Sequence, residues 1–307
     1  MNWFWFAILA LICWSGSDLF SKIGCRDSDD KTSHLKMVTA VGVVMGLHAA
    51  YVIFVGGVEI SWDVIITYLP VSALYILSMT IGYMGLRYIE LSISSPICNS
   101  SGALVAVMAI TMSLITRDTA GISVPQIIAT ALVCIGVISL GFVEAREDEE
   151  ARLVRQSVSN YKYSKSVLAI LLPVIYCILD AAGTFADSLV LEKLNEDSAN
   201  VAYELTFLAC GIVCLVILLI KRSKFTVKRE APKYIGALFE TVGQFAYIYA
   251  LADEEHVAMS APIISAYCLA SVLWSRLFLK EKLSWKHYVS IAVAAVGIVV
   301  LGVLDEL

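Results

Sequence analysis

Long apolar runs separated by short polar connections dominate the hydrophobic pattern of this chain. Ten such runs can be drawn, and each reaches the roughly 20 residues that a helix needs to cross the hydrocarbon core of a bilayer. They are 2–23, 35–56, 64–88, 92–115, 122–144, 166–190, 199–220, 232–252, 257–279 and 284–304. The runs are too long for membrane β-strands and do not alternate, so the pattern predicts an all-α membrane protein with ten transmembrane helices.

A charged stretch at 145–165 divides this pattern into two halves. The chain on its two sides repeats, because Pro96 in LSISSPICNSSGALV and Pro262 in VAMSAPIISAYCLAS take equivalent places. Residues 1–144 and 166–307 are therefore predicted to be two five-helix repeats joined by a charged linker. An odd number of helices per repeat gives the halves opposite orientations, as in the inverted repeats of secondary transporters.

The composition supports a membrane protein and narrows the function. The chain of 307 residues is 59% hydrophobic and 16% charged, with a formal net charge of −5, whereas a soluble domain has about 25% charged residues. A water-soluble enzyme, a disordered chain and a nucleic-acid-binding protein with a basic face are therefore excluded. The N-terminal MNWFWFAILALICW lacks a basic segment and a small-residue cleavage site, so we interpret it as the first spanning helix.

The sequence lacks motifs for enzymatic or cofactor chemistry. It has no phosphate-binding G-x-x-x-x-G-K-[S/T], no H-E-x-x-H and no G-x-S-x-G segment. The eight cysteines lie in or near apolar runs and are expected to be small packing residues. No His and Cys residues cluster at metal-ligand spacing. We therefore expect no enzyme activity, no cofactor and no bound metal.

Basic residues are shared unevenly between the two sides of the predicted bundle. Of the 22 Lys and Arg residues, only Arg117 and Lys193 fall on the side of the termini, and the other 20 fall on the side of 145–165. Basic short loops stay in the cytoplasm. The charges therefore predict a multi-pass protein of the cell membrane with both termini outside and the 145–165 linker in the cytoplasm.

Several segments resemble EamA-type transporters of the drug/metabolite transporter superfamily. The resemblance is carried by CWSGSDLFSK in the first helix, GLRYIELSISSP before the fourth and TRDTAGISVPQIIATALVCIGVISLG around the fifth. It is most specific in RLFLKEKLSWKHYVSIAVAAVGIVVLG, where Glu281 in a short turn precedes a helix with spaced glycines. It implies a ten-helix carrier of small organic solutes with a central cavity between the halves. It also implies cytoplasmic termini, and we give the opposing loop charges more weight.

Carboxyl groups in the middle of predicted helices are the most informative polar positions. A charge there costs about 2.5–3.5 kcal/mol on insertion scales, so such a group usually faces a cavity. Asp180 lies near the middle of the sixth run and shares a helix face with Tyr176. Glu240 lies near the middle of the eighth run, with Gln244 and Tyr247 on its face. We predict that these five residues bind the substrate and that the two carboxyls also take up and release a proton.

Three other polar positions have more than one interpretation. Asp18 either pairs with Lys22, four residues later in the first helix, or faces the cavity. Glu204 is either a third proton-coupling carboxyl or a solvated group near the membrane surface. His48 is expected to be a packing residue.

The prolines of the fourth and ninth runs predict another wall of the cavity. Pro96 and Pro262 interrupt backbone hydrogen bonding, and Asn99 and Tyr267 follow them closely. We predict that Asn99, Tyr267 and Trp14 bind the substrate, although packing is the alternative role for each. Acidic groups beside aromatic rings, with basic groups kept to helix ends, favour a cationic or zwitterionic substrate.

The sequence therefore predicts a secondary active transporter that moves a small polar metabolite, such as an amine or amino acid, by alternating access. The expected partners are this solute and the lipid bilayer, not nucleic acid, and the chain is expected to be a monomer or a homodimer. Two alternatives are a translocator of lipid-linked headgroups and a non-transporting membrane scaffold or sensor.

Overall fold

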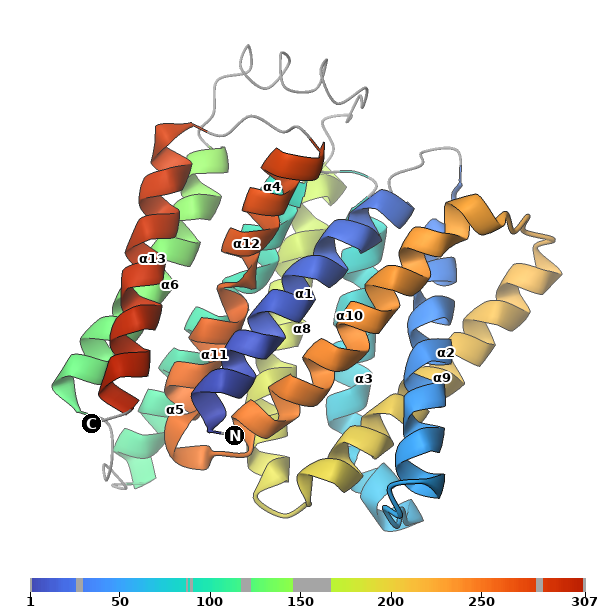
Figure 1. Cartoon of the computed structure of the whole chain (residues 1–307), viewed down its shortest axis with the longest axis horizontal. Coiled ribbons are helices and arrows are strands. Elements are labelled where there is room, and N and C mark those ends of the chain that lie inside the picture. The colour runs from blue at the N-terminus through green and yellow to red at the C-terminus, as the bar shows by residue number, and fades with distance from the viewer. Residues whose placement is uncertain are drawn as a thin grey trace.

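The described part of the chain is a bundle of helices with no strand among its described residues (Figure 1). The computed structural model describes residues 2–25, 30–86, 88, 91–116, 123–145, 167–279 and 284–305. The predicted linker, from residue 146 onward, and the turn that contains Glu281 lie outside these residues.

The helices follow the predicted apolar runs to within a few residues. The first half forms α1 (Trp3–Cys25), α2 (Ser33–Phe54), α3 (Trp62–Gly85), α4 (Leu91–Asn99), α5 (Ser101–Thr116) and α6 (Val124–Ala145). The second half forms α8 (Val167–Leu191), α9 (Glu196–Ile220), α10 (Val227–Leu251), η1 (Glu254–His256), α11 (Val257–Ser265), α12 (Tyr267–Trp274), the π-helical η2 (Ser275–Leu279) and α13 (Trp285–Asp305).

Two of the ten predicted helices are interrupted near their middles. The fourth run forms α4 and α5, which meet at Ser100, and the ninth forms α11 and α12, which meet at Ala266. Pro262 lies inside α11 and has no N–H to donate. The Ala266 N–H donates to the carbonyl oxygens of Pro262 and Ile263 at 3.0 and 3.1 Å, which tightens the chain at the break. The other eight predicted helices are continuous.

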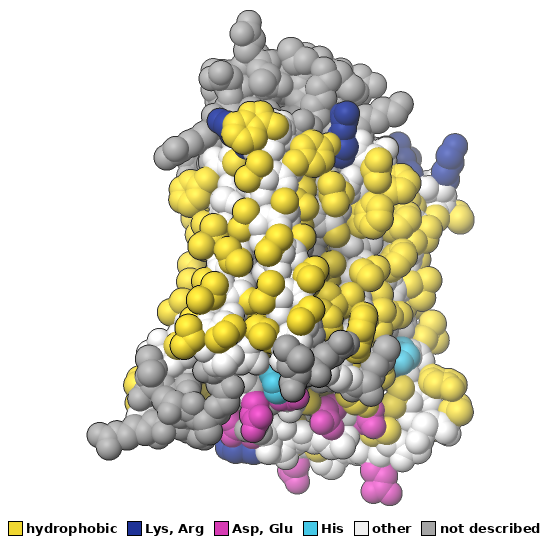
Figure 2. Space-filling model, turned by 60° about the vertical axis from the view of Figure 1, so that its left-hand side comes forward, with side chains coloured by type: hydrophobic (Ala, Val, Ile, Leu, Met, Phe, Trp, Pro, Cys, Tyr) yellow, Lys and Arg dark blue, Asp and Glu magenta, His cyan; other side chains and the backbone are white. Residues whose placement is uncertain are grey.

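Length and composition identify the chain as a multi-pass membrane protein. Six described helices are long and apolar enough to cross a membrane, and three shorter apolar helices accompany them. Helix α10 is not among these, and it carries the polar side chains of Glu240 and Gln244 in its middle. On the face in view, Figure 2 shows hydrophobic side chains between an end with Lys and Arg and an end with mostly Asp and Glu.

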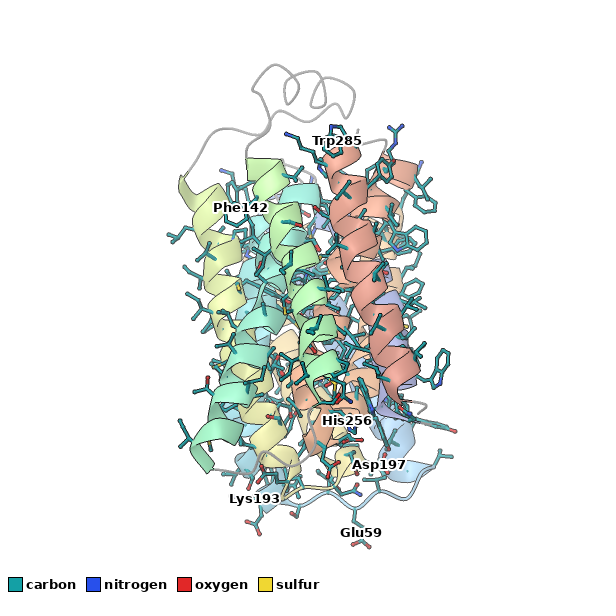
Figure 3. The ribbon with its side chains drawn as sticks, turned by 90° about the vertical axis from the view of Figure 1, so that its left-hand side faces the viewer. Glu59, Phe142, Lys193, Asp197, His256 and Trp285 are labelled. Carbon is teal, nitrogen blue, oxygen red and sulfur yellow. The ribbon has the colours of Figure 1, made fainter. Side chains whose placement is uncertain are left out.

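The bundle has two distinct ends, which we name the linker end and the terminal end. Helix α6 ends and α8 begins at the linker end, whereas the N-terminus of α1, the C-terminus of α13 and the α8–α9 turn lie at the terminal end (Figure 1). Figure 3 places Phe142 and Trp285 at the linker end, and Glu59, Lys193 and Asp197 at the terminal end.

Helices of the two halves pack chiefly against each other. The main pairs are α1 with α10, α2 with α9, α3 with α8, α4 with α12, α5 with α11 and α6 with α13. Some crossings depend on glycine: a Cβ on Gly102 of α5 would lie 2.8 Å from the carbonyl oxygen of Ala261 in α11. A Cβ on Gly136 of α6 would lie 2.8 Å from the carbonyl oxygen of Ser290 in α13. These contacts bring the two halves together around a shared interior.

An ion-pair cluster fastens α2 to α10 at the linker end. The Lys36 Nζ lies 2.7 Å from Asp30 Oδ2 and 3.2 Å from Glu230 Oε1, and the Lys233 Nζ lies 2.8 Å from Glu230 Oε2. Burial raises the pKa of Asp30, but hydrogen bonds from Lys36 and Thr32 outweigh burial and hold this pKa below its ordinary value.

Candidate functional site

A cavity of about 690 Å³, including the part open to solvent, lies between the two halves. Leu86 and Leu91 line it at the linker end, where α3 ends and α4 begins. Tyr75, in the middle of α3, and Tyr267, at the break between α11 and α12, also line it. The cavity therefore extends from the middle of the bundle to the linker end.

The residues predicted to bind substrate gather around this space. Seven of the eight line the cavity, and they are Trp14, Asn99, Tyr176, Asp180, Glu240, Gln244 and Tyr267. The eighth, Tyr247, lines a smaller cavity of about 330 Å³, again including the part open to solvent. The two cavities adjoin, because Asp180 and Trp14 line both. The structure thus brings the eight side chains together, while their role in binding stays a prediction.

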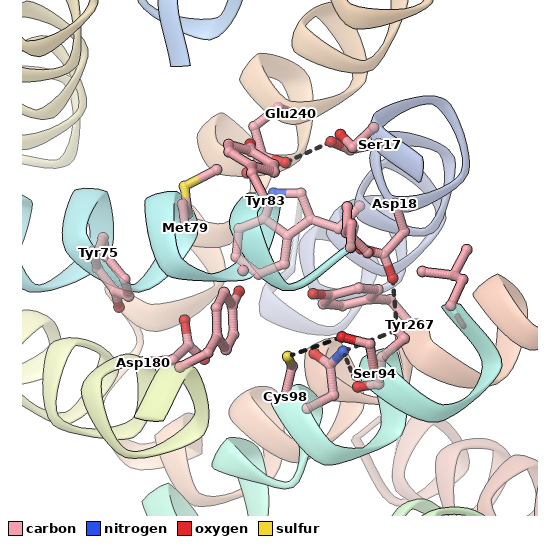
Figure 4. Close-up of a pocket in the computed structure, with 18 of the residues that line it drawn as sticks. Ser17, Asp18, Tyr75, Met79, Tyr83, Ser94, Cys98, Asp180, Glu240 and Tyr267 are labelled. Atoms are coloured by element: carbon pink, nitrogen blue, oxygen red, sulfur yellow. Dashed lines mark hydrogen bonds between the residues drawn. The ribbon is translucent and has the colours of Figure 1, made fainter. Parts of the chain in front are cut away.

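Each of the two predicted central carboxyls is held by a serine of another helix. Ser17 of α1 donates a 2.7 Å hydrogen bond to Glu240 Oε2 on α10, and Ser101 of α5 donates a 2.7 Å hydrogen bond to Asp180 Oδ2 on α8. Glu240 and Asp180 lie on different sides of the cavity in Figure 4. A single neutral donor does not cancel the charge of a carboxylate, so both groups keep the capacity to bind a cation.

Asp18 is a third carboxyl of the cavity wall. Its Oδ2 accepts hydrogen bonds from Ser95 of α4 at 2.6 Å and from Ser271 of α12 at 2.8 Å. The Lys22 Nζ donates instead to the carbonyl oxygen of Leu86 at 2.8 Å. The two side chains therefore reach partners on other helices, and Asp18 faces the cavity.

The cavity wall is acidic and offers hydrogen-bond donors. None of the described residues that line it is Lys, Arg or His. The amide nitrogen of Gln244 and the hydroxyl of Tyr83 are buried and have no hydrogen-bond partner among the described residues. Because unpaired buried polar atoms are costly, they are suited to contact a polar solute or water.

Aromatic side chains border the cavity on its terminal side. The Trp14 ring centroid lies 4.9 Å from that of Tyr247 and 5.7 Å from that of Tyr267. The Tyr75 hydroxyl contacts the Tyr247 hydroxyl and donates a 3.1 Å hydrogen bond to Thr184. This cluster separates the cavity from the terminal end of the bundle.

Helix α3 contributes a wall of the cavity that includes none of the residues predicted to bind substrate. Tyr75, Met79, Gly82 and Tyr83 all line the cavity (Figure 4 labels three of them). Their spacing of four, seven and eight residues from Tyr75 places them on one helix face. That spacing is a signal by which they could have been found, although the helix contains no charge in its middle to draw attention to it.

Glu204 lies outside the cavity lining. Its Oε1 is 2.7 Å from His48 Nδ1 and accepts a 3.2 Å hydrogen bond from the Asn200 side chain, at the contact between α2 and α9. The Glu204 side chain is 0% exposed, so its interpretation as a solvated surface group is wrong. His48, expected to serve packing, is instead the ion-pair partner of this carboxyl when protonated.

Comparisons with known proteins concern the second half most directly. Residues 167–303 match the model of the EamA-like transporter family. Among curated proteins, none matches the chain. A crystal structure described only as "Crystal structure of protein" is similar with a TM-score of 0.65, over 99% of this chain and 97% of its own, at 13% sequence identity. At that identity the likeness shows the fold alone.

Proposed function

We propose that this chain, an EamA-type member of the drug/metabolite transporter superfamily, is a secondary active transporter of a small cationic or zwitterionic metabolite, such as an amine or amino acid. The charge of the cavity wall is the main support for the proposal. Asp18, Asp180 and Glu240 line the cavity, and none of its described lining residues is basic. Charges interact more strongly in a low-dielectric interior than in water, so an acidic wall there selects for a positive group.

The other lining residues supply orientation and contact area. The unpaired donors of Gln244 and Tyr83 suit a carboxylate or carbonyl oxygen of a zwitterionic solute. The rings of Trp14, Tyr176 and Tyr267 offer faces to an ammonium group, a contact worth about 0.5–2 kcal/mol. A solute with an amino group and a neighbouring acceptor fits this arrangement best.

Transport by this site requires that the two halves move relative to each other. We infer that residues 1–144 and 166–307 are inverted repeats, joined by the 145–165 linker, that rock about the cavity. The helix pairs support this inference. When the two halves are exchanged, the α1–α10 pair becomes the α8–α3 pair, and the α4–α12 pair becomes the α11–α5 pair. The pairs α2–α9 and α6–α13 map onto themselves.

The orientation we propose places the linker end in the cytoplasm and both termini outside the cell membrane. The described basic residues Lys221, Arg222 and Lys224 follow α9 at the linker end, and Figure 2 shows acidic side chains at the terminal end. In this orientation the cavity extends toward the cytoplasm. We propose that the chain works as a monomer or a homodimer.

A proton competes with a cationic solute at the cavity carboxyls in this proposal. When Asp180 or Glu240 is protonated, the wall loses negative charge and attracts a cation less strongly. Binding of a cation then releases a proton, which is the basis of exchange transport.

A thermal-shift screen of the purified protein tests the proposal. Amines, amino acids, nucleosides and neutral sugars are added one at a time at two pH values, and the melting temperature is measured. We expect stabilisation by an amine or amino acid, weaker at the lower pH. Stabilisation only by neutral sugars or by anions would contradict a cationic substrate.

A further inference from the structure

Another buried carboxyl, Asp187 of α8, lies between the aromatic cluster and the terminal end. We propose that Asp187 is a proton-binding site separate from the substrate cavity, and that it takes up and releases a coupling proton during the transport cycle. The coupling role rests on the proposed transport function, whereas proton binding by Asp187 does not.

Asp187 is fully enclosed and incompletely hydrogen-bonded. Its side chain is buried, with the residue 0% exposed. Its Oδ1 accepts a 2.7 Å hydrogen bond from the Tyr68 hydroxyl of α3, while its Oδ2 has no hydrogen-bond partner among the described residues. A buried carboxylate with one neutral donor is costly, and protonation removes that cost by removing the charge.

The groups that face Asp187 do not include a described cation. Tyr68 and Tyr75 face it from α3, Tyr203 from α9 and Tyr247 from α10, and all four are tyrosines. Asp180, seven residues earlier on the same helix, adds negative charge on that side. With no described basic side chain facing it, Asp187 can lose its charge by binding a proton.

A row of hydroxyl groups links Asp187 to the cavity. Thr184, one turn before Asp187, lines the smaller cavity together with Asp180 and Tyr247. The Tyr75 hydroxyl belongs to the same row, because it donates a 3.1 Å hydrogen bond to Thr184 and contacts the Tyr247 hydroxyl. Hydroxyl groups both donate and accept, so such a row can pass a proton between the cavity and the region of Asp187.

The ligand of this site is a proton rather than an organic solute or a metal ion. Asp187 lines neither of the two cavities described above, so a solute held there does not contact it. No group of three or more His, Cys, Asp or Glu with metal-binding geometry occurs in the described ranges. The Tyr68 hydroxyl donates its hydrogen to Asp187 Oδ1. A donor hydrogen at that oxygen repels a cation, so this contact disfavours a metal ion there.

Infrared difference spectroscopy of the reconstituted protein tests proton binding without any substrate. The carbonyl stretch of protonated carboxylic acids is followed during a pH titration of the wild type and of Asp187→Asn. We expect the variant to lose one titrating band that the wild type shows. Asp197→Asn is the matched control, because Asp197 accepts a 2.5 Å hydrogen bond from Tyr249 but is only partly buried, and it is expected to retain the band. Identical titrations for wild type and Asp187→Asn would overturn the proposal.

A second variant keeps the test valid if Asp187→Asn fails to fold. Tyr68→Phe retains the carboxyl and removes its donor, so we expect the band to remain and its titration midpoint to move. An unmoved midpoint, or a band that responds to sodium at constant pH, would contradict proton binding at Asp187.

A transport measurement tests the coupling role. Asp187→Asn is expected to retain the thermal-shift response to the solute and to lose uptake driven by a pH gradient. If no solute binds to the wild type, the transport proposal fails while the infrared result stands.

Discussion

Ser101 of α5 donates a 2.7 Å hydrogen bond to the carboxylate of Asp180 on α8. An asparagine at position 180 has nearly the same shape and retains an oxygen that can accept this bond. Ser17 relates to Glu240 in the same way, at 2.7 Å. Amide substitutions at these two positions therefore separate the charge of the cavity from its hydrogen bonding.

Asp180→Asn and Glu240→Gln are each expected to fold and to bind a cationic solute at least about tenfold more weakly, which corresponds to about 1.4 kcal/mol. Calorimetric titration with the best compound from the thermal-shift screen measures the loss. Glu192→Gln, which removes an exposed carboxyl after α8, is the control and is expected to bind as the wild type does. Unchanged affinity in both cavity variants would remove these carboxyls from the binding site.

Glu204→Gln is expected to lower the stability of the protein and to leave solute affinity unchanged. Glu204 does not line the cavity, so solute affinity stays near the wild-type value. The variant loses its charge-assisted contact with His48, which is expected to cost about 1–3 kcal/mol of stability. Thermal unfolding and binding, measured on the same preparation, distinguish the two effects. A variant that melts normally but fails to bind would support a role for Glu204 in transport instead.

Gly102→Ala is expected to destabilise the protein by about 1–3 kcal/mol, since the new methyl group would overlap the α11 backbone at Ala261. Gly85→Ala is the matched control, because a Cβ there would meet the Leu172 Cβ at 3.6 Å, an ordinary contact. Melting temperatures of the two variants provide the measurement. Equal melting temperatures would show that α5 and α11 do not cross as closely as the position of Gly102 beside Ala261 indicates.

Asp30→Asn tests the ion-pair cluster at the linker end. The pKa of Asp30 is held below its ordinary value, so this carboxylate stabilises the folded protein above its unfolded-state pKa. That contribution is lost as the pH falls through the lower folded-state pKa. We expect the variant to melt about 1–3 °C below the wild type at neutral pH, since partly exposed ion pairs contribute little. The difference should vanish in strong acid, and a difference that persists there would have another origin.

Cysteine labelling tests the orientation. Ser157→Cys, in the predicted linker outside the described residues, is expected to resist a membrane-impermeant maleimide in intact cells and to react after lysis. Asp305→Cys, at the end of α13, is expected to react in intact cells. The reverse pattern would place both termini in the cytoplasm.

The sequence predicted the helices well because a bilayer imposes a minimum length on each apolar run. It also indicated Asp180 and Glu240, since the cost of a charge in the middle of a helix leaves few alternatives to an internal cavity. The partners of Asp18 were not predictable, because Ser95 and Ser271 lie far away in the chain and only the packing of α4 and α12 on α1 brings them close. Spacing within one helix indicated Lys22 instead.

Positions that depend on contacts between helices were likewise beyond the sequence pattern. The pairing of Glu204 with His48 requires the crossing of α2 and α9, and no local signal joins the two residues. The α3 wall of the cavity consists of uncharged residues, and its polarity resembles that of ordinary packing surface. The break at Ala266 was indicated by Pro262, whereas its position relative to Gly102 depends on how the halves pack.

Counterflow in proteoliposomes tests the central claim most directly. Vesicles that contain the purified protein are loaded with the unlabelled amine or amino acid identified by the screen, and uptake of its radiolabelled form is followed. The wild type and Glu192→Gln are expected to accumulate label, and Asp180→Asn and Glu240→Gln are expected to remain at the level of protein-free vesicles. Full counterflow by both cavity variants, with normal folding, would contradict an acidic central cavity as the transport site.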